Sequence, residues 1–285
     1  MAEMAELESE FSFSAYYYMG IKISGFRDSF DRYTTEYIQK IFDYVPKDQQ
    51  LFETLKEKQK KEYVNYFLNV PYQLAYTSIT RALREGASIC PAERLKEIDS
   101  ITLEDIVAFA KQWAKKVYLE FYMTGNLKEE QARRIAEHIE KFASDRAAPL
   151  SKALIGAIRP IFLPVGKVCA VEEPLTSQDE NNNSLIVHYQ YEQFNLKTKL
   201  MQELAHSFVK EPAFDFLRTK EQLGYIVMCL SDDHRGVIGL SILVQSNIKN
   251  TYELQKYVSR FVNEILKEEL NKLNEETFKE FKNAL

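Results

Sequence analysis

The segment EPAFDFLRTKEQLGYIV, residues 211–227, places Arg218 seven positions before Tyr225, with Gly224 directly in front of the tyrosine. Pro212 suits the first turn of a helix, so we predict that a helix begins there. The apolar run that follows Gly224 is typical of a buried strand. We therefore expect Arg218 near the end of a helix and Tyr225 at the start of the next strand.

Arg218 and Tyr225 would together present a guanidinium group and a phenol on two rigid elements. Such donors can bind the carbonyl oxygens of an extended peptide, or an oxyanion that forms on one of them. The alternative is structural: Arg218 pairs with a nearby carboxylate and Tyr225 fills a gap in the core. The spacing alone favours this alternative, because both residue types are common and no catalytic base lies nearby in the sequence.

A family resemblance adds to this interpretation. The phrase LRTKEQLGYIV, residues 217–227, resembles the arginine–tyrosine segment of the insulin-degrading enzyme-like members of the insulinase/pitrilysin family, which are inverzincin zinc metallopeptidases. MTGNL, residues 123–127, resembles the Gly-Asn turn that leads from a strand into a helix in this family. GIKISGF, residues 20–26, resembles a strand and turn of the third domain, and residues 181–191 resemble the start of the fourth domain's sheet.

The resemblance implies an α+β fold made of two insulinase-type domains, each a mostly antiparallel sheet packed with helices. Residues 1–146 would be the C-terminal part of the third domain, and residues 147–285 most of the fourth. Both domains would be truncated, so we expect the chain to be a fragment of the C-terminal half of a longer protein. The length of 285 residues also favours two domains.

The resemblance also implies a function. Two bowl-like halves would close around a short peptide, with the catalytic zinc and the base held by H-x-x-E-H in the N-terminal half. This chain would complete the chamber, and its partners would be that N-terminal catalytic half and peptide substrates. Arg218 and Tyr225 would contact the substrate backbone, orienting the carbonyl and stabilising the oxyanion. The chain alone is expected to be inactive.

The histidines indicate no metal site in this chain. His138, His188, His206 and His234 are all more than five residues apart, so no two of them form a paired-histidine motif. Glu203 and His206 share a helix face, and a solvent-exposed pair is the simplest interpretation. We expect His188 at the edge of the core and His234 in an exposed loop. We therefore predict no metal ligand here, and zinc only in the full-length enzyme.

Other catalytic classes lack their motifs. The sequence contains no G-x-S-x-G, no glycine-rich phosphate loop and no C-x-x-C pattern. Cys90, Cys169 and Cys229 are odd in number and far apart, which favours a reducing compartment over disulfides.

Composition excludes several partners. The chain is 45% hydrophobic and 28% charged, as is usual for a globular protein, and its net charge of −5 argues against a nucleic-acid partner. No window is apolar enough to span a bilayer, so we expect no membrane partner. The first residues lack the pattern of a secretory signal, which leads us to expect a cytoplasmic location.

The periodicity predicts alternating strands and helices with a linker at residues 144–166, where proline and glycine accumulate. A polar loop is expected at residues 177–183. Strands are expected at residues 11–23, 117–124, 167–171, 184–191, 225–230 and 236–245. Helices are expected at residues 33–45, 51–68, 71–82, 102–113, 128–142, 196–210 and 254–265, and in the last residues of the chain.

Two other functional classes stay open. One is a catalytically inactive family member that acts as a scaffold or as a subunit of a processing complex. The other is an interaction module whose helix faces bind a partner chain. Unpaired strand edges would also allow a homo-oligomer. An intact H-x-x-E-H in the rest of the protein would favour the peptidase.

Overall fold

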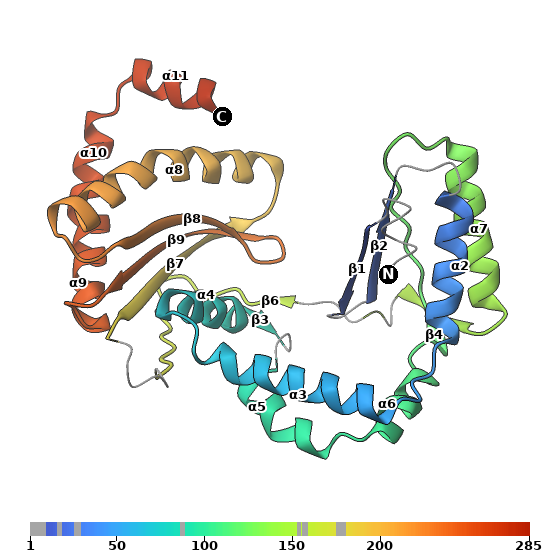
Figure 1. Cartoon of the computed structure of the whole chain (residues 1–285). Helices are drawn as coiled ribbons and strands as arrows, with labels where there is room; N and C mark the ends of the chain where they lie inside the picture. The colour runs from blue at the N-terminus through green and yellow to red at the C-terminus, as the bar shows by residue number, and fades with distance from the viewer. Residues whose placement is uncertain are drawn as a thin grey trace. The chain divides into compact units, whose positions relative to one another are not determined.

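A computed structural model of the chain describes residues 10–15, 19–25, 30–85, 89–152, 155, 159–174 and 181–285. It divides into two compact units (Figure 1): unit 1 comprises Met1–Gln59 and Lys96–Ala157, and unit 2 comprises Lys60–Leu95 and Ile158–Leu285. The domain boundary placed at residue 146 concerns the family's domains and stays a prediction. Most of the predicted loop at residues 177–183 lies outside the described residues.

Unit 1 is built on a helix pair and small sheets. Phe42 of helix α2 packs against Trp113 and against Phe142 of helix α7, with ring centroids 5.1 and 5.7 Å apart. The predicted cap at Thr102 is confirmed, since its hydroxyl accepts a hydrogen bond from the Asp105 amide. The unit contains β1 (Glu10–Ala15), β2 (Met19–Ser24), α2 (Phe30–Asp43), η1 (Ile98–Ser100), α6 (Leu103–Ala110), β4 (Lys116–Val117), α7 (Glu129–Ser144) and β5 (Ala148–Pro149). Helices α3 (Gln49–Tyr66) and α5 (Pro91–Glu97) run across the division between the units.

Unit 2 is built on a three-stranded antiparallel sheet of order β7-β9-β8. Helix α8 covers one face of this sheet and helix α4 lies on the other (Figure 1). Because neighbouring residues of a strand point to opposite faces, each strand offers one set of side chains to each helix. The elements are α4 (Pro71–Ala82), β3 (Arg84–Glu85), β6 (Arg159–Pro160), β7 (Asn183–Gln193), α8 (Leu196–Phe214), η3 (Asp215–Lys220), β8 (Ile226–Asp233), β9 (Val237–Ser246), α9 (Thr251–Arg260), η4 (Phe261–Ile265), α10 (Leu266–Lys272) and α11 (Glu275–Ala284).

The main core of unit 2 lies between the sheet and helices α8 and α9. Leu217, Leu254 and Phe261 are fully buried and pack with Val244 of β9. Burying each such side chain contributes about 1.5–3 kcal/mol relative to exposure, so this layer holds the Arg218–Tyr225 segment in place. The α+β class predicted from the sequence is confirmed.

Two predicted strands are wrong. After β4 the chain has no regular structure at residues 118–124, where the Tyr122 side chain is almost fully exposed. Residues 167–171 are also irregular, and Val168 and Val171 are exposed. Both segments have strand-like composition, but neither has a partner strand among the described residues, and a strand without a ladder is not stable.

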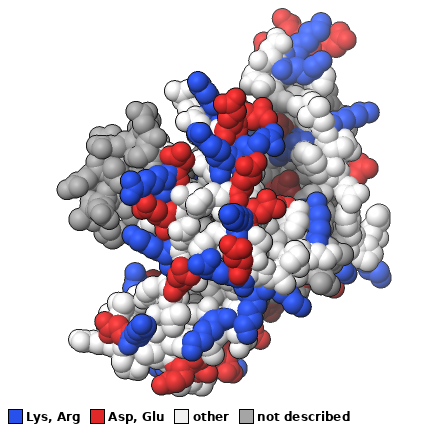
Figure 2. All heavy atoms as spheres, turned by 90° about the vertical axis from the view of Figure 1, so that its right-hand side faces the viewer, with Lys and Arg blue, Asp and Glu red and all other residues white. Residues whose placement is uncertain are grey.

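The surface carries both signs of charge. Figure 2 shows lysine and arginine beside aspartate and glutamate over the face drawn, which fits the small net charge of −5. Within the described part of the chain, no helix is long and apolar enough to cross a bilayer.

Candidate functional site

Arg218 lies in the π-helix η3, which continues helix α8 without a break. The predicted helix start at Pro212 is wrong, because α8 begins at Leu196, where Asn195 caps it by accepting a hydrogen bond from the Thr198 amide. Pro212 therefore lies inside the helix, where it cannot donate a backbone hydrogen bond. The wider π-turn follows within three residues, and such turns frequently occur at functional sites.

Tyr225 immediately precedes strand β8, which is held close to β9. A Cβ added at Gly224 would lie 2.0 Å from the carbonyl oxygen of Gln245, so only glycine fits against the neighbouring strand. The amide of Leu223 donates a hydrogen bond to the carbonyl of Leu217, which closes the turn between η3 and β8. The predicted placement of Arg218 at a helix end and of Tyr225 at a strand start is confirmed.

The two side chains contact each other. The guanidinium carbon of Arg218 lies 4.3 Å from the Tyr225 ring centroid and 4.7 Å from that of Phe214. Tyr225 is 81% exposed, so it does not fill the core. Among the described residues, the Arg218 guanidinium group forms neither an ion pair nor a hydrogen bond, and the residue is partly buried. The exposed Tyr225 and the lack of a carboxylate partner for Arg218 both differ from the structural alternative, in which the tyrosine fills the core and the arginine forms an ion pair.

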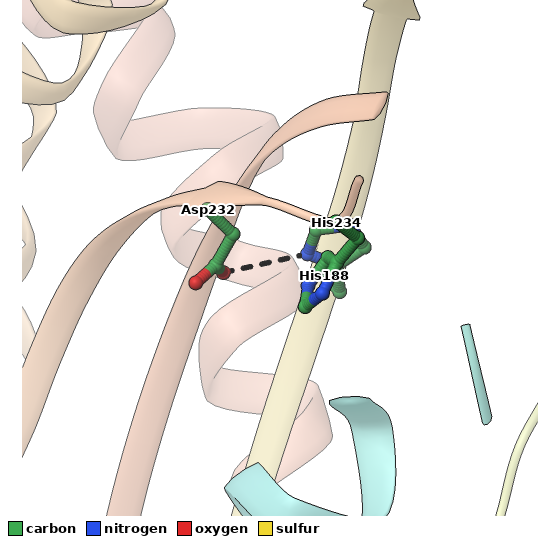
Figure 3. Close-up of side chains that lie close together, drawn as sticks. All are labelled: His188, Asp232 and His234. Atoms are coloured by element: carbon green, nitrogen blue, oxygen red, sulfur yellow. Dashed lines mark ion pairs between the residues drawn. The ribbon is translucent and has the colours of Figure 1, made fainter. Parts of the chain in front are cut away.

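A second polar cluster lies on the α4 side of the sheet (Figure 3) and consists of His188, Asp232 and His234. His188 of β7 pairs with Ser241 of β9, and Asp232 of β8 pairs with Gly239, two residues earlier on β9. Positions two apart on a strand share a face, so His188 and Asp232 lie on the same side of the sheet. His234 follows β8 in the tight turn to β9.

The cluster is buried and linked by hydrogen bonds. Nδ1 of His188 lies 2.9 Å from Oγ of Ser241 and 3.5 Å from Oδ2 of Asp232, and the Ser241 hydroxyl donates to that same carboxylate. The predicted exposure of His234 is wrong, since only 3% of its surface is accessible. Sequence reasoning missed this cluster because it compared only histidines close in the chain. The signal that could have found it is Ser241, a polar residue inside the apolar run of residues 237–244, together with the pairing of the strands.

Burial and hydrogen bonding set the protonation of the cluster. Burial tends to raise the pKa of Asp232, but hydrogen bonds from His188 and Ser241 outweigh it and hold the pKa below its usual value. Burial, and then the neighbouring His188, lower the pKa of His234. At neutral pH the cluster therefore presents a carboxylate and an uncharged His234 imidazole.

The remaining candidate residues have local partners. His206 donates a hydrogen bond from Nε2 to the carbonyl of Cys229, and Glu203 pairs with Lys199 at 3.4 Å. In unit 1, Nε2 of His138 lies 3.0 Å from the Gln39 amide nitrogen. Burial raises the pKa of the Cys229 thiol to about 11, which argues against a nucleophilic role.

Comparison with known proteins finds relatives along the chain. Residues 1–97 match the family described as the middle or third domain of peptidase M16, and residues 204–285 match the C-terminal lobe domain 4 of PQQ synthase PqqF-like proteins. The A-factor-processing enzyme of Saccharomyces cerevisiae is 30% identical over 268 residues, which cover 94% of this chain and 26% of that protein. The chain is a relative of the M16 peptidases.

Other M16 peptidases give the same result. Insulin-degrading enzyme of Homo sapiens is 26% identical over 287 residues, with 100% of this chain and 27% of that protein covered. The crystal structure of pitrilysin superposes with a TM-score of 0.72 at 18% identity, covering 97% of this chain and 28% of that one, which supports the shared fold. The chain thus spans about a quarter of the length of the curated M16 relatives it matches.

Proposed function

We propose that this chain forms part of the peptide-binding chamber of an M16 zinc metalloendopeptidase, in which Arg218 and Tyr225 contact the substrate backbone. The observation that carries the proposal is the contact between a partly buried Arg218 and an exposed Tyr225. The tyrosine ring is 81% exposed, and the arginine contacts that ring rather than a carboxylate of the described residues. A pair that only stabilised the core would have a buried tyrosine or an arginine neutralised by a carboxylate, and neither is found among the described residues.

The chemistry of the pair suits a peptide carbonyl. The guanidinium group keeps its charge at all working pH values and offers several N–H donors, whereas the phenol donates one short hydrogen bond from a stiff ring. Helix η3 and the start of strand β8 hold both groups in place, so their side chains lose little conformational freedom when a peptide binds. When the carbonyl becomes tetrahedral, the same donors stabilise the negative charge on its oxygen.

The catalytic zinc of the family does not fit this chain. Its motif H-x-x-E-H is absent from the sequence, and the buried His188–Asp232–His234 cluster lies near the opposite end of β8 from Tyr225. Asp232 lies seven positions after Tyr225 along extended chain, a distance of roughly 23 Å. We assign the zinc and the base to an N-terminal catalytic half, which is the proposed partner of this chain, and we expect the chain alone to hydrolyse no peptide.

The test compares Tyr225→Phe and Arg218→Ala in the complete enzyme, with kcat, KM and thermal stability measured on the same preparations. Tyr225→Phe removes one donor and keeps the ring, so kcat should fall by about 10²-fold. Arg218→Ala removes a charge-assisted donor worth roughly 1.5–3 kcal/mol, so KM should rise as well. Tyr252→Phe is the matched control, because Tyr252 is 67% exposed on helix α9 and should keep wild-type kinetics.

Two results would contradict the proposal in different ways. Variants that melt at lower temperature but keep wild-type kcat/KM per folded molecule would assign Arg218 and Tyr225 a purely structural role. A complete, folded, zinc-loaded protein that hydrolyses no peptide would instead favour the inactive scaffold or processing-complex subunit.

A further inference from the structure

The His188–Asp232–His234 cluster leaves two buried ring nitrogens without a partner. Nε2 of His188 and Nδ1 of His234 form no hydrogen bond with any described residue. Both side chains are buried, since only 2% of the His188 side chain and 3% of His234 are exposed. Leaving a buried polar atom unsatisfied costs about 1–3 kcal/mol, so native proteins seldom retain two side by side. A ligand that accepts nitrogen lone pairs would remove this cost.

The hydrogen bonds assign the free lone pair on His188. The Ser241 hydroxyl donates to Asp232, so its oxygen accepts from Nδ1–H of His188 at 2.9 Å. A neutral imidazole with its proton on Nδ1 carries its lone pair on Nε2. Metal-bound histidines typically show this arrangement, in which one nitrogen binds the ion and the other donates a hydrogen bond that orients the ring.

We propose that His188, Asp232 and His234 form a binding site for one divalent transition-metal ion of the zinc type. The three residues offer ligand atoms that all lie within 4.8 Å of one another. In a tetrahedral site with bonds of about 2.0–2.2 Å, ligand atoms lie roughly 3.3–3.6 Å apart, so small side-chain rotations suffice to close the set. Two imidazoles and one carboxylate suit zinc, whereas magnesium and calcium prefer sites made of oxygen ligands.

The backbone around the cluster provides space for this arrangement. A Cβ at Gly239 would lie 2.5 Å from Cε1 and 2.8 Å from Nε2 of His188, so any larger residue would displace the imidazole ring.

The charged residues near the cluster carry both signs. Arg84 repels a cation, whereas Asp233 adds a second carboxylate that attracts one, as their opposite effects on the pKa of His234 show.

The ion would have a structural role. It would join β7, the end of β8 and the β8–β9 turn beneath helix α4, far from Tyr225. This site is independent of the peptidase proposal and replaces the expectation that the chain contains no metal ligand.

The experiment uses the purified 285-residue chain after removal of metals with a chelator. Titration with Zn²⁺ should raise its melting temperature, and Co²⁺ should bind one per chain and give the visible absorption of a low-symmetry site. His188→Gln, His234→Gln and Asp232→Asn should each weaken Co²⁺ binding by more than about 100-fold, beyond the 10–100-fold typical of losing a residue that only orients a ligand. Ser241→Ala should fall within that lower range.

His138→Gln is the matched control, because this histidine lies in unit 1 outside the cluster and should leave binding unchanged. Far-ultraviolet circular dichroism of each variant separates lost binding from lost folding. A folded wild-type chain that retains no zinc and gives no cobalt spectrum would overturn the proposal. Wild-type affinity in folded His188→Gln and His234→Gln variants would also overturn it.

Discussion

At the residue scale, close backbone packing decides where Tyr225 lies. Gly224 lets the chain approach β9, and Tyr225 then lies immediately before β8 with its ring exposed. This exposed ring contacts the Arg218 guanidinium group. Gly224 thereby fixes the position of the Tyr225 phenol, a hydrogen-bond donor whose exposure the local sequence does not predict.

Burial of individual thiols predicts their reactivity. Because burial raises the pKa of Cys229 to about 11, only about 0.1% of this thiol is ionised at pH 8. Iodoacetamide should therefore modify the exposed Cys169 well before Cys229, and modification of Cys229 should accelerate as pH rises towards 11. Mass spectrometry of peptides quenched at successive times measures both rates. Equal rates at pH 8 in the folded chain would contradict this prediction.

At the element scale, asparagine caps and π-turns shape the helices of unit 2. Asn195, Asn250 and Asn274 each accept a hydrogen bond from the amide three residues later, which fixes where α8, α9 and α11 begin. The π-helices η3 and η4 pack against each other through Phe216 and Phe261, whose ring centroids lie 6.1 Å apart. Both interruptions of helical geometry thus meet in the core beside Arg218.

The cap of helix α9 should contribute measurably to stability. Asn250 accepts a hydrogen bond of 2.9 Å from the Glu253 amide, and the Glu253 carboxylate accepts one from the Asn250 amide. Asn250→Ala should lower the free energy of unfolding by about 1 kcal/mol, because the helix loses a partner for its first amides. Asn250→Ser, which keeps a cap, should remain near wild type. Urea unfolding measures both, and equal loss in the two variants would exclude capping as the cause.

At the scale of the whole molecule, the buried apolar side chains are unevenly distributed. Strand β9 is buried along most of its length and pairs on both sides, whereas the helix pair of unit 1 buries mainly Ile135, Ile139 and Phe142 of α7. Local opening costs least where few apolar contacts are lost. The two units should therefore differ in local stability.

Hydrogen exchange should reveal this difference. Amides of β9 should exchange slowest in the chain, and those of α2 and α7 should exchange earlier, because opening unit 1 exposes less buried surface. Mass spectrometry of peptides after deuterium labelling measures both regions in one sample. Protection of α7 equal to that of β9 would show that the two units unfold as one.

The α+β class followed from the family resemblance. The residue pattern alone predicted most helices, the cap at Thr102, and the positions of Arg218 near a helix end and Tyr225 near a strand start. These features depend on local periodicity, capping chemistry and one glycine, which act over a few residues. Two expected strands, residues 118–124 and 167–171, failed because a strand exists only with a partner. Pro212 suggested a helix start, but the capped helix from Leu196 and its packing overrode the local preference.

Which distant residues meet depends on the tertiary structure. The register of β7, β9 and β8 brings His188 to Asp232, 44 positions later in the chain, and buries His234 in a turn that composition alone marks as exposed. It also places the Tyr225 ring at the surface instead of in the core. Strand pairing and burial depend on the whole sheet and its covering helices, and the energies that set them are not encoded in any short segment.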